Sequence, residues 1–158
     1  MSRAFTKEDD TSLQLADIGE RPVSPHRNLV TSEGLAAIDA QLSTLREEFA
    51  RAEGEGDRER MALAARDLRY WTARRETAEV SVPEPDSDVV RFGMTVAIED
   101  EDGKQKKWKI VGEDEAEPSQ GSISHVSPMA IALFGKRVGD AVMVSGREWG
   151  IIEIGTGG

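Results

Sequence analysis

Four carboxylates lie within seven positions and are the first residues that could do chemistry: Glu53, Glu55, Asp57 and Glu59. Mg²⁺ is a hard cation that prefers carboxylate oxygens and keeps several of its waters. A carboxylate pair can therefore hold such an ion and orient an attacking water molecule, and these four acids give the segment the chemical capacity to do so. The alternative is a solvent-exposed acidic turn between two helices, where the positive charge of Arg60 would disfavour a bound cation.

No other set of residues suggests catalysis. The chain has no cysteine, which excludes disulfides, thiol catalysis and cysteine-ligated zinc. His26 follows a proline and is expected at the surface, and two isolated histidines, His26 and His125, do not make a metal site. Ser127 has no companion histidine and acid in a recognisable arrangement, so we interpret it as a helix N-cap. We therefore expect no enzymatic activity of the chain's own.

Two amphipathic helices are predicted on either side of the acidic cluster. Thr31 or Ser32 can cap the first helix. Apolar residues then recur at spacings of three and four: Leu35, Ile38, Leu42, Leu45 and Phe49. After a glycine-rich interruption the same spacing returns in a second series: Met61, Ala64, Leu68 and Trp71. Two short apolar seams favour an antiparallel helical hairpin, a short coiled coil about 30 Å long with the acids at its tip.

The second half of the chain has a different character. Residues 83–88 carry two prolines and three acids and are expected to form a linker. Short runs of β-prone residues follow: Val89–Phe92, Thr95–Ile98, Lys107–Val111, Ala141–Val144 and Trp149–Ile154. Asp102 and Gly103 predict a tight turn, and Ser127–Phe134 predicts one short helix with Pro128 at its first position. The fold class expected from these elements is α+β, a helical hairpin followed by a small antiparallel β domain with one short helix.

Composition is typical of a small, polar globular protein. The chain has 158 residues, of which 38% are hydrophobic and 32% charged, and its net charge is −10. Proteins that bind free duplex DNA usually present a basic surface, so we expect a protein partner before bare nucleic acid. The sequence has no signal peptide and no apolar run of membrane length, which favours a cytoplasmic protein. The expected domains are a flexible arm (1–28), the helical hairpin (29–82), the linker (83–88), the β domain (89–154) and a flexible tail (155–158).

Several motifs occur in one order and at close spacing: Ile110–Ala116, Ile123–Ser124, Ser127–Ala130 and Val138–Asp140. Together they resemble the C-terminal domain of the GreA/GreB transcript-cleavage factors. Thr31–Leu45 resembles the start of the first helix in that family. Asp67–Trp71 resembles the late part of the second helix, most like the GreB branch. The resemblance covers about residues 29–154; each motif alone is weak, whereas the ordered set is specific.

The resemblance implies an FKBP-like C-terminal domain that carries a coiled-coil arm. In this family the domain docks on bacterial RNA polymerase and the arm enters its secondary channel. Acidic residues at the tip there assist the polymerase's own two-metal cleavage of backtracked RNA by sharing a Mg²⁺ ion with the polymerase. By this resemblance the candidate metal-binding acids of the present chain are Asp57 and Glu59. The expected docking residues lie where the family motifs are densest: Asp114, Glu115, Ser127, Pro128 and Met129. The FKBP-like shape does not imply isomerase activity, since function resides in sites rather than in folds.

The chain departs from the family pattern in two places. Each half of its arm is about eight to ten residues shorter than in the family, which shortens the arm by roughly 12–15 Å. At the tip, the family has an Asp followed three residues later by a Glu. Asp57 matches the first acid, whereas Arg60 stands in the place of the second, with Glu59 beside it. We therefore predict a regulator that occupies the channel and competes or modulates there, like the short-armed Rnk proteins.

Two alternatives stay open at this point. A shifted docking pose would let the tip acids assist cleavage of backtracked RNA. The chain could also be an adaptor that kept a Gre-like fold, binds another protein and has no action on transcript cleavage. In the leading interpretation we expect a monomer with no intrinsic cofactor, which shares at most the Mg²⁺ of the polymerase and meets nucleic acid only indirectly.

Overall fold

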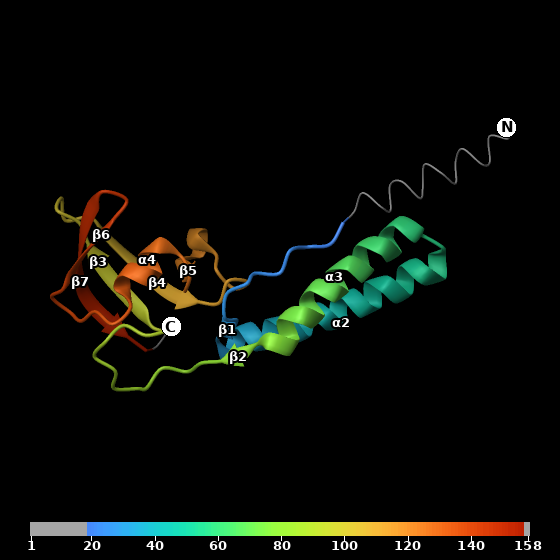
Figure 1. The fold of residues 1–158 in the computed structure, drawn as a ribbon, viewed down its shortest axis with the longest axis horizontal. Helices are drawn as coiled ribbons and strands as arrows, with labels where there is room; N and C mark the ends of the chain where they lie inside the picture. The colour runs from blue at the N-terminus through green and yellow to red at the C-terminus, as the bar shows by residue number, and fades with distance from the viewer. Residues whose placement is uncertain (1–18, 157–158) are drawn as a thin grey trace. The chain divides into compact units, whose positions relative to one another are not determined.

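The structure is a computed structural model that describes residues 19–156 (Figure 1). The chain forms two compact units. The hairpin unit contains the segment that ends at Pro25 together with Ala36–Thr77, and the C-terminal unit contains His26–Leu35 and the chain from Ala78 onward. The segment expected to form the hairpin is thus divided between the two units. Most of the expected flexible arm, residues 1–18, lies outside the described residues.

Two long helices, α2 (Ser32–Glu55) and α3 (Arg58–Thr77), lie side by side in the hairpin unit (Figure 1). Of the predicted apolar series on α2, Ile38, Leu42 and Leu45 are buried, whereas Leu35 and Phe49 are half-buried. Ala52, which the series did not include, is also buried. An ion pair of 2.7 Å between Arg75 Nε and Asp39 Oδ1 also joins the helices. The predicted hairpin is therefore present, and the buried apolar stripe of α2 stabilises it.

The seam on α3 differs from the expected one. Ala64 is buried as predicted, but Leu68 and Trp71 are only half-buried. The second buried residue of this helix is Arg74, which is 1% exposed. Helix α3 contributes few large apolar side chains to the seam. Burial of its inner face therefore stabilises the hairpin less than burial of a leucine-rich face would.

The C-terminal unit contains a curled five-stranded sheet. Its strands are β3 (Thr95–Glu99), β4 (Gln105–Val111), β5 (Ser122–Ser124), β6 (Ala141–Val144) and β7 (Arg147–Gly155). Their order is β5-β4-β3-β7-β6, and β3, β4, β6 and β7 pair antiparallel. The β4–β5 pair is parallel, which the sequence did not predict. A short 3₁₀ helix, η1 (Pro118–Gln120), lies in the connection between β4 and the edge strand β5. The α+β fold class is confirmed.

One hydrophobic core fills the C-terminal unit. Its buried residues come from all five strands, from the segment before β3 and from the short helix α4 (Pro128–Leu133): Val90, Phe92, Val96, Ile98, Ile110, Ile123, Ala130, Leu133, Val142, Trp149 and Ile151. Trp149 is 4% exposed, as expected of a core anchor. Apolar residues face inward along β3 and β7, and they share this core with Ala130 and Leu133 of α4.

The expected strand at Val89–Phe92 is not a strand. Val90 and Phe92 are buried in the core, but the segment pairs with no neighbouring strand. Val90 instead exchanges hydrogen bonds with the loop after α4: Val90 N donates to Lys136 O at 2.9 Å, and Gly135 N donates to Val90 O at 3.0 Å. The prediction was wrong because apolar β-prone residues indicate burial, while a strand also needs a partner along the ladder.

A short parallel pair lies where the chain enters and leaves the hairpin. It is formed by β1 (Leu29–Val30) and β2 (Glu79–Val80). Glu79 N donates to Asn28 O at 2.9 Å, and the Arg27 side chain bonds the Glu79 carboxylate at 3.0 Å. The Arg27 hydrogen bond also lowers the pKa of Glu79. Within residues 19–156, no helix is long and apolar enough to cross a membrane.

Candidate functional site

The acidic cluster forms the turn between α2 and α3. Gly56 has a φ of +68°, a left-handed conformation that glycine adopts without strain and that ends α2. Two backbone hydrogen bonds close the turn, from Gly56 N to Glu53 O at 3.1 Å and from Asp57 N to Ala52 O at 2.9 Å. Asp57 then caps α3, because its Oδ1 accepts a hydrogen bond of 3.1 Å from Arg60 N. One oxygen of this carboxylate is therefore used to start a helix.

Arg60 lies against the acids of the turn. Its Nη1 is 2.6 Å from Glu55 Oε2 and 3.9 Å from Asp57 Oδ2. The guanidinium group therefore contacts Glu55 and one member of the predicted pair, Asp57. A second positive charge placed among these groups would be repelled by Arg60, so the contact weakens the capacity of the turn to hold a metal ion.

Glu53 and Glu59 are exposed side chains of the same turn. Glu59 follows Asp57 by two residues, in the first turn of α3. Residues two apart on a helix do not face each other, so the carboxylates of Asp57 and Glu59 are not directed at one point. Within residues 19–156, no three His, Cys, Asp or Glu side chains are grouped so that they could hold a metal ion. The metal role of Asp57 and Glu59 stays a prediction, and this geometry does not favour it.

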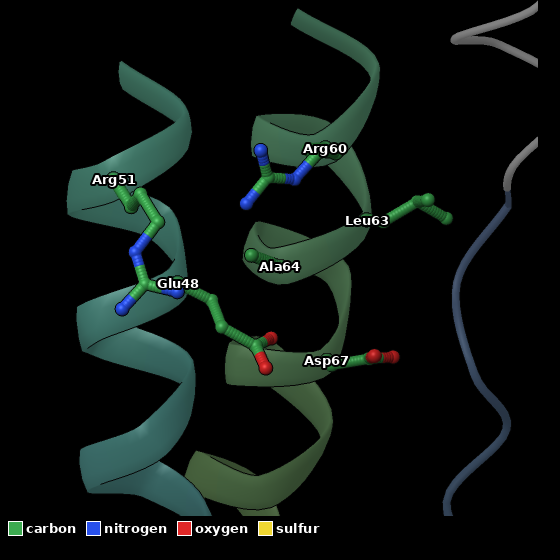
Figure 2. A pocket seen from close by; sticks show the side chains of 6 residues that line it. All are labelled: Glu48, Arg51, Arg60, Leu63, Ala64 and Asp67. Atoms are coloured by element: carbon green, nitrogen blue, oxygen red, sulfur yellow. The ribbon is translucent and has the colours of Figure 1, made fainter. Parts of the chain in front are cut away.

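An open groove of about 300 Å³ lies between the two helices next to the turn. Its lining is predominantly charged: Glu48, Arg51, Arg60, Leu63, Ala64 and Asp67. Figure 2 shows Glu48 reaching from α2 toward α3 and Arg51 lying along α2, while Leu63 and Asp67 point away from α2, toward the segment that precedes β1. Two arginines and two acids balance each other, so the groove has no strong preference for an ion of either sign.

The start of α4 carries three of the expected docking residues. Ser127 is the N-cap, as predicted, because its Oγ accepts a 3.3 Å hydrogen bond from Ala130 N. Pro128 is exposed and Met129 is half-buried at the first two helical positions. Ile131, on the same helix, is 62% exposed. The helix thus presents a small apolar surface, and its role in docking stays a prediction.

Glu115 has an environment unlike that of a surface docking residue. Its carboxylate accepts hydrogen bonds of 3.0 Å from the backbone N–H groups of Thr31 and Gly112, and another from the Thr31 hydroxyl. The Thr31 hydroxyl in turn accepts a 3.0 Å bond from Gly34 N, so Thr31 caps α2 as predicted. We call this arrangement the Glu115 clasp. It binds the start of α2 to the loop after β4, while the neighbouring Asp114 is half-buried.

Two glycines leave the space that the Glu115 clasp occupies. A Cβ atom at Gly34 would lie well under 3.0 Å from the Glu115 carboxyl group. A Cβ atom at Gly112 would lie 2.8 Å from Glu115 Oε2 and 2.5 Å from Leu29 O. Sequence reasoning missed the clasp because Thr31 and Glu115 are 84 positions apart. A glycine three residues after a capping threonine was the available signal.

His125 is a core residue rather than part of a surface. It is 8% exposed, and its ring packs edge-to-face on Phe92 with 5.6 Å between the ring centres. The aromatic contact joins the loop before α4 to the segment before β3.

Comparison with known proteins decides the family. Residues 84–155 match the sequence model described as transcription elongation factor, GreA/GreB, C-terminal. The transcription elongation factor GreA of Solidesulfovibrio magneticus is 37% identical over 134 residues, which cover 73% of this chain and 82% of that protein. The chain belongs to the GreA/GreB family. The Gre relationship extends to the GreB of Neisseria meningitidis, which is 36% identical over 145 residues, covering 77% of this chain and 89% of that protein.

Solved structures of Gre factors also align with the chain. A GreA/GreB elongation factor from Nitrosomonas europaea has 22% sequence identity and a TM-score of 0.41, and the alignment covers 82% of this chain and 98% of that one. The GreA factor homologue Gfh1 of Thermus thermophilus gives a TM-score of 0.40 at 22% identity, with 82% and 99% covered. The family predicted from the sequence motifs is confirmed by the curated relatives, which are named as transcription elongation factors.

Proposed function

We propose that this Gre-family protein binds bacterial RNA polymerase through its C-terminal unit and places the helical hairpin in the secondary channel. It regulates elongation there mainly by occupying the channel, and it stimulates cleavage of backtracked RNA weakly or not at all. It has no catalytic activity of its own and meets nucleic acid only through the polymerase. A net charge of −10 supports a protein partner rather than free nucleic acid.

The contact of Arg60 with Glu55 and Asp57 is the observation that carries this proposal. A factor that assists two-metal cleavage has to offer unpaired carboxylates to a weakly held Mg²⁺. Here one oxygen of Asp57 caps α3, and Arg60 contacts the carboxylates of Asp57 and Glu55. These residues do not fit a Mg²⁺ site in the arrangement that the chain adopts. The tip is suited to fill space beside a catalytic centre rather than to add a metal to it.

The length of the arm supports the same conclusion. Helix α3 has 20 residues, which corresponds to roughly 30 Å at helical rise. Relative to the family pattern each half of the arm is short by about eight to ten residues, or roughly 12–15 Å. Bonds between Mg²⁺ and oxygen are about 2.1 Å long, so a deficit of this size keeps the carboxylates from direct coordination when the docking pose is that of the family.

The first experiment tests polymerase binding. Immobilised core RNA polymerase is incubated with the native chain, and bound protein is titrated against a full-length cleavage factor. We expect saturable binding and mutual competition. The docking surface is tested by Met129→Gln, with Met143→Gln as the control, since Met143 is an exposed methionine of β6. Absence of polymerase binding by the native chain would favour the adaptor alternative.

The second experiment tests cleavage in stalled, backtracked complexes. The native chain is compared with Asp57→Ala, Glu59→Ala and Arg60→Glu, the last of which restores an acid at the family's second position. We expect no more than weak cleavage by the native chain. Strong stimulation that Asp57→Ala and Glu59→Ala both abolish would contradict the proposal and establish a metal-delivering tip.

A further inference from the structure

The segment of residues 19–25, which we call the strap, lies along α3 in the hairpin unit (Figure 1). The strap precedes the part of the chain that carries the family motifs, and the proposed function does not use it. It is held by the side chains of two consecutive residues. Glu20 Oε1 is 2.6 Å from Arg69 Nη2, and Arg21 Nη1 is 3.3 Å from Asp67 Oδ1.

Arg21 makes the most specific of these contacts. Its guanidinium carbon lies 3.9 Å from the centre of the Tyr70 ring and 5.7 Å from the Trp71 ring. Both distances lie within the range at which an aromatic face attracts a cation. Tyr70 and Trp71 are themselves packed edge-to-face, with ring centres 5.1 Å apart. Together with the Asp67 carboxylate, the two rings offer a planar cation both an aromatic surface and an acceptor.

We propose that Asp67, Tyr70 and Trp71 form an arginine-binding cage on α3, which this chain fills with its own Arg21. Arginine fits the cage because its guanidinium group is flat, stacks on a ring and donates in the plane of the stack to a carboxylate. Arg66 also donates to Asp67 Oδ1, at 3.1 Å, so the carboxylate faces two arginines and each contact is weaker than an isolated pair. The cage therefore holds the strap reversibly.

The sequence of the strap supports recognition of an extended segment. Pro22 directly follows Arg21, and a residue before proline is restricted to extended backbone. Pro25 restricts Ser24 in the same way. Val23 between them is 46% exposed, so the apolar part of the strap adds little to the contact. The class of ligand that suits the cage is thus an extended peptide with arginine followed by proline, supplied here in cis.

Tyr70 allows a direct test, because it is the one tyrosine of the chain. Selectively labelled tyrosine gives one set of ring resonances in an NMR spectrum of the full-length protein. We expect Arg21→Ala to shift these resonances, whereas Arg46→Ala, which removes an exposed arginine from α2, leaves them in place. Arg21→Lys should behave more like Arg21→Ala than like the native chain, because lysine keeps the charge but lacks the planar group.

A second experiment tests whether the emptied cage binds the strap sequence when it is added as a separate peptide. The heptapeptide with the sequence of residues 19–25 is added to the Arg21→Ala protein at about 1–10 mM, the range of effective concentration that a short tether provides in cis. We expect the Tyr70 resonances to return toward their native positions, and the native protein to respond less because its cage is filled. A peptide with alanine in place of arginine should have no effect. Three results would each overturn the cage: unchanged Tyr70 resonances in Arg21→Ala, native Tyr70 resonances in Arg21→Lys, or equal responses to the two peptides. None of these measurements involves the polymerase, so their failure is distinct from failure of the proposed function.

Discussion

Removal of the Glu115 carboxylate should loosen the start of α2 and destabilise the C-terminal unit. In Glu115→Ala, the Thr31 N–H, the Gly112 N–H and the Thr31 hydroxyl all lose their acceptor. A hydrogen bond to a charged group contributes about 1.5–3 kcal/mol when nothing replaces it. The site is half-buried, so water takes over part of this interaction, and we expect a net loss of about 2–4 kcal/mol. That is a large fraction of the 5–15 kcal/mol typical of a folded domain.

The measurement is urea unfolding of the full chain, followed by far-UV circular dichroism and by tryptophan fluorescence, to which the buried Trp149 contributes. The control is Glu117→Ala, because Glu117 is an exposed acid in the same loop. A double-mutant cycle with Thr31→Val should give a coupling energy of at least about 1 kcal/mol, since the two residues share one network. A loss in Glu115→Ala that equals the loss in Glu117→Ala, or a coupling energy near zero, would refute the reasoning.

Three further predictions concern the hairpin, the strap and the docking surface. Leu45→Ala should cost about 2–5 kcal/mol in unfolding free energy because Leu45 is 3% exposed, whereas Leu68→Ala should cost less because Leu68 is half-buried; thermal or urea unfolding distinguishes them. The hydrogen bond with Arg69 lowers the pKa of the exposed Glu20 carboxyl from its ordinary value. This contact therefore holds the strap while the carboxyl is ionised and is lost as the pH falls through the lowered pKa, which a titration of the Tyr70 resonances would follow. Met129→Gln should weaken polymerase binding at least tenfold, measured by competition. Urea unfolding checks that the variant is folded, because Met129 also packs against the core. Equal affinity would remove α4 from the docking surface.

Local patterns predicted most of the elements. The spacing of Ile38, Leu42 and Leu45 indicated a helix with one buried stripe, because residues three and four apart lie on one face whatever the rest of the chain does. Ser127 was predicted as an N-cap because capping involves residues only three positions apart. The motifs of the C-terminal domain likewise lie in one contiguous region, and the match over residues 84–155 confirms this part of the resemblance.

Long-range contacts were not predictable in the same way. The pairing of β1 with β2 and the Glu115 clasp join segments that are far apart in the sequence, and neither segment shows which partner it will meet. The turn acids were predicted as a group, but the direction of Arg60 was not. Side-chain direction decides whether Glu55 and Asp57 face solvent or a guanidinium group, and residue type alone does not fix it.

The space left by Gly34 and Gly112 has a consequence for how this sequence can change over time. A side chain at either glycine would displace the Glu115 carboxylate, and a shorter residue at position 115 would leave the start of α2 without its acceptor. The three positions are therefore expected to vary as a set. Among related sequences, those with alanine or a larger residue at position 34 should carry a shorter residue at position 115, and single replacements should be selected against even where polymerase contacts are intact.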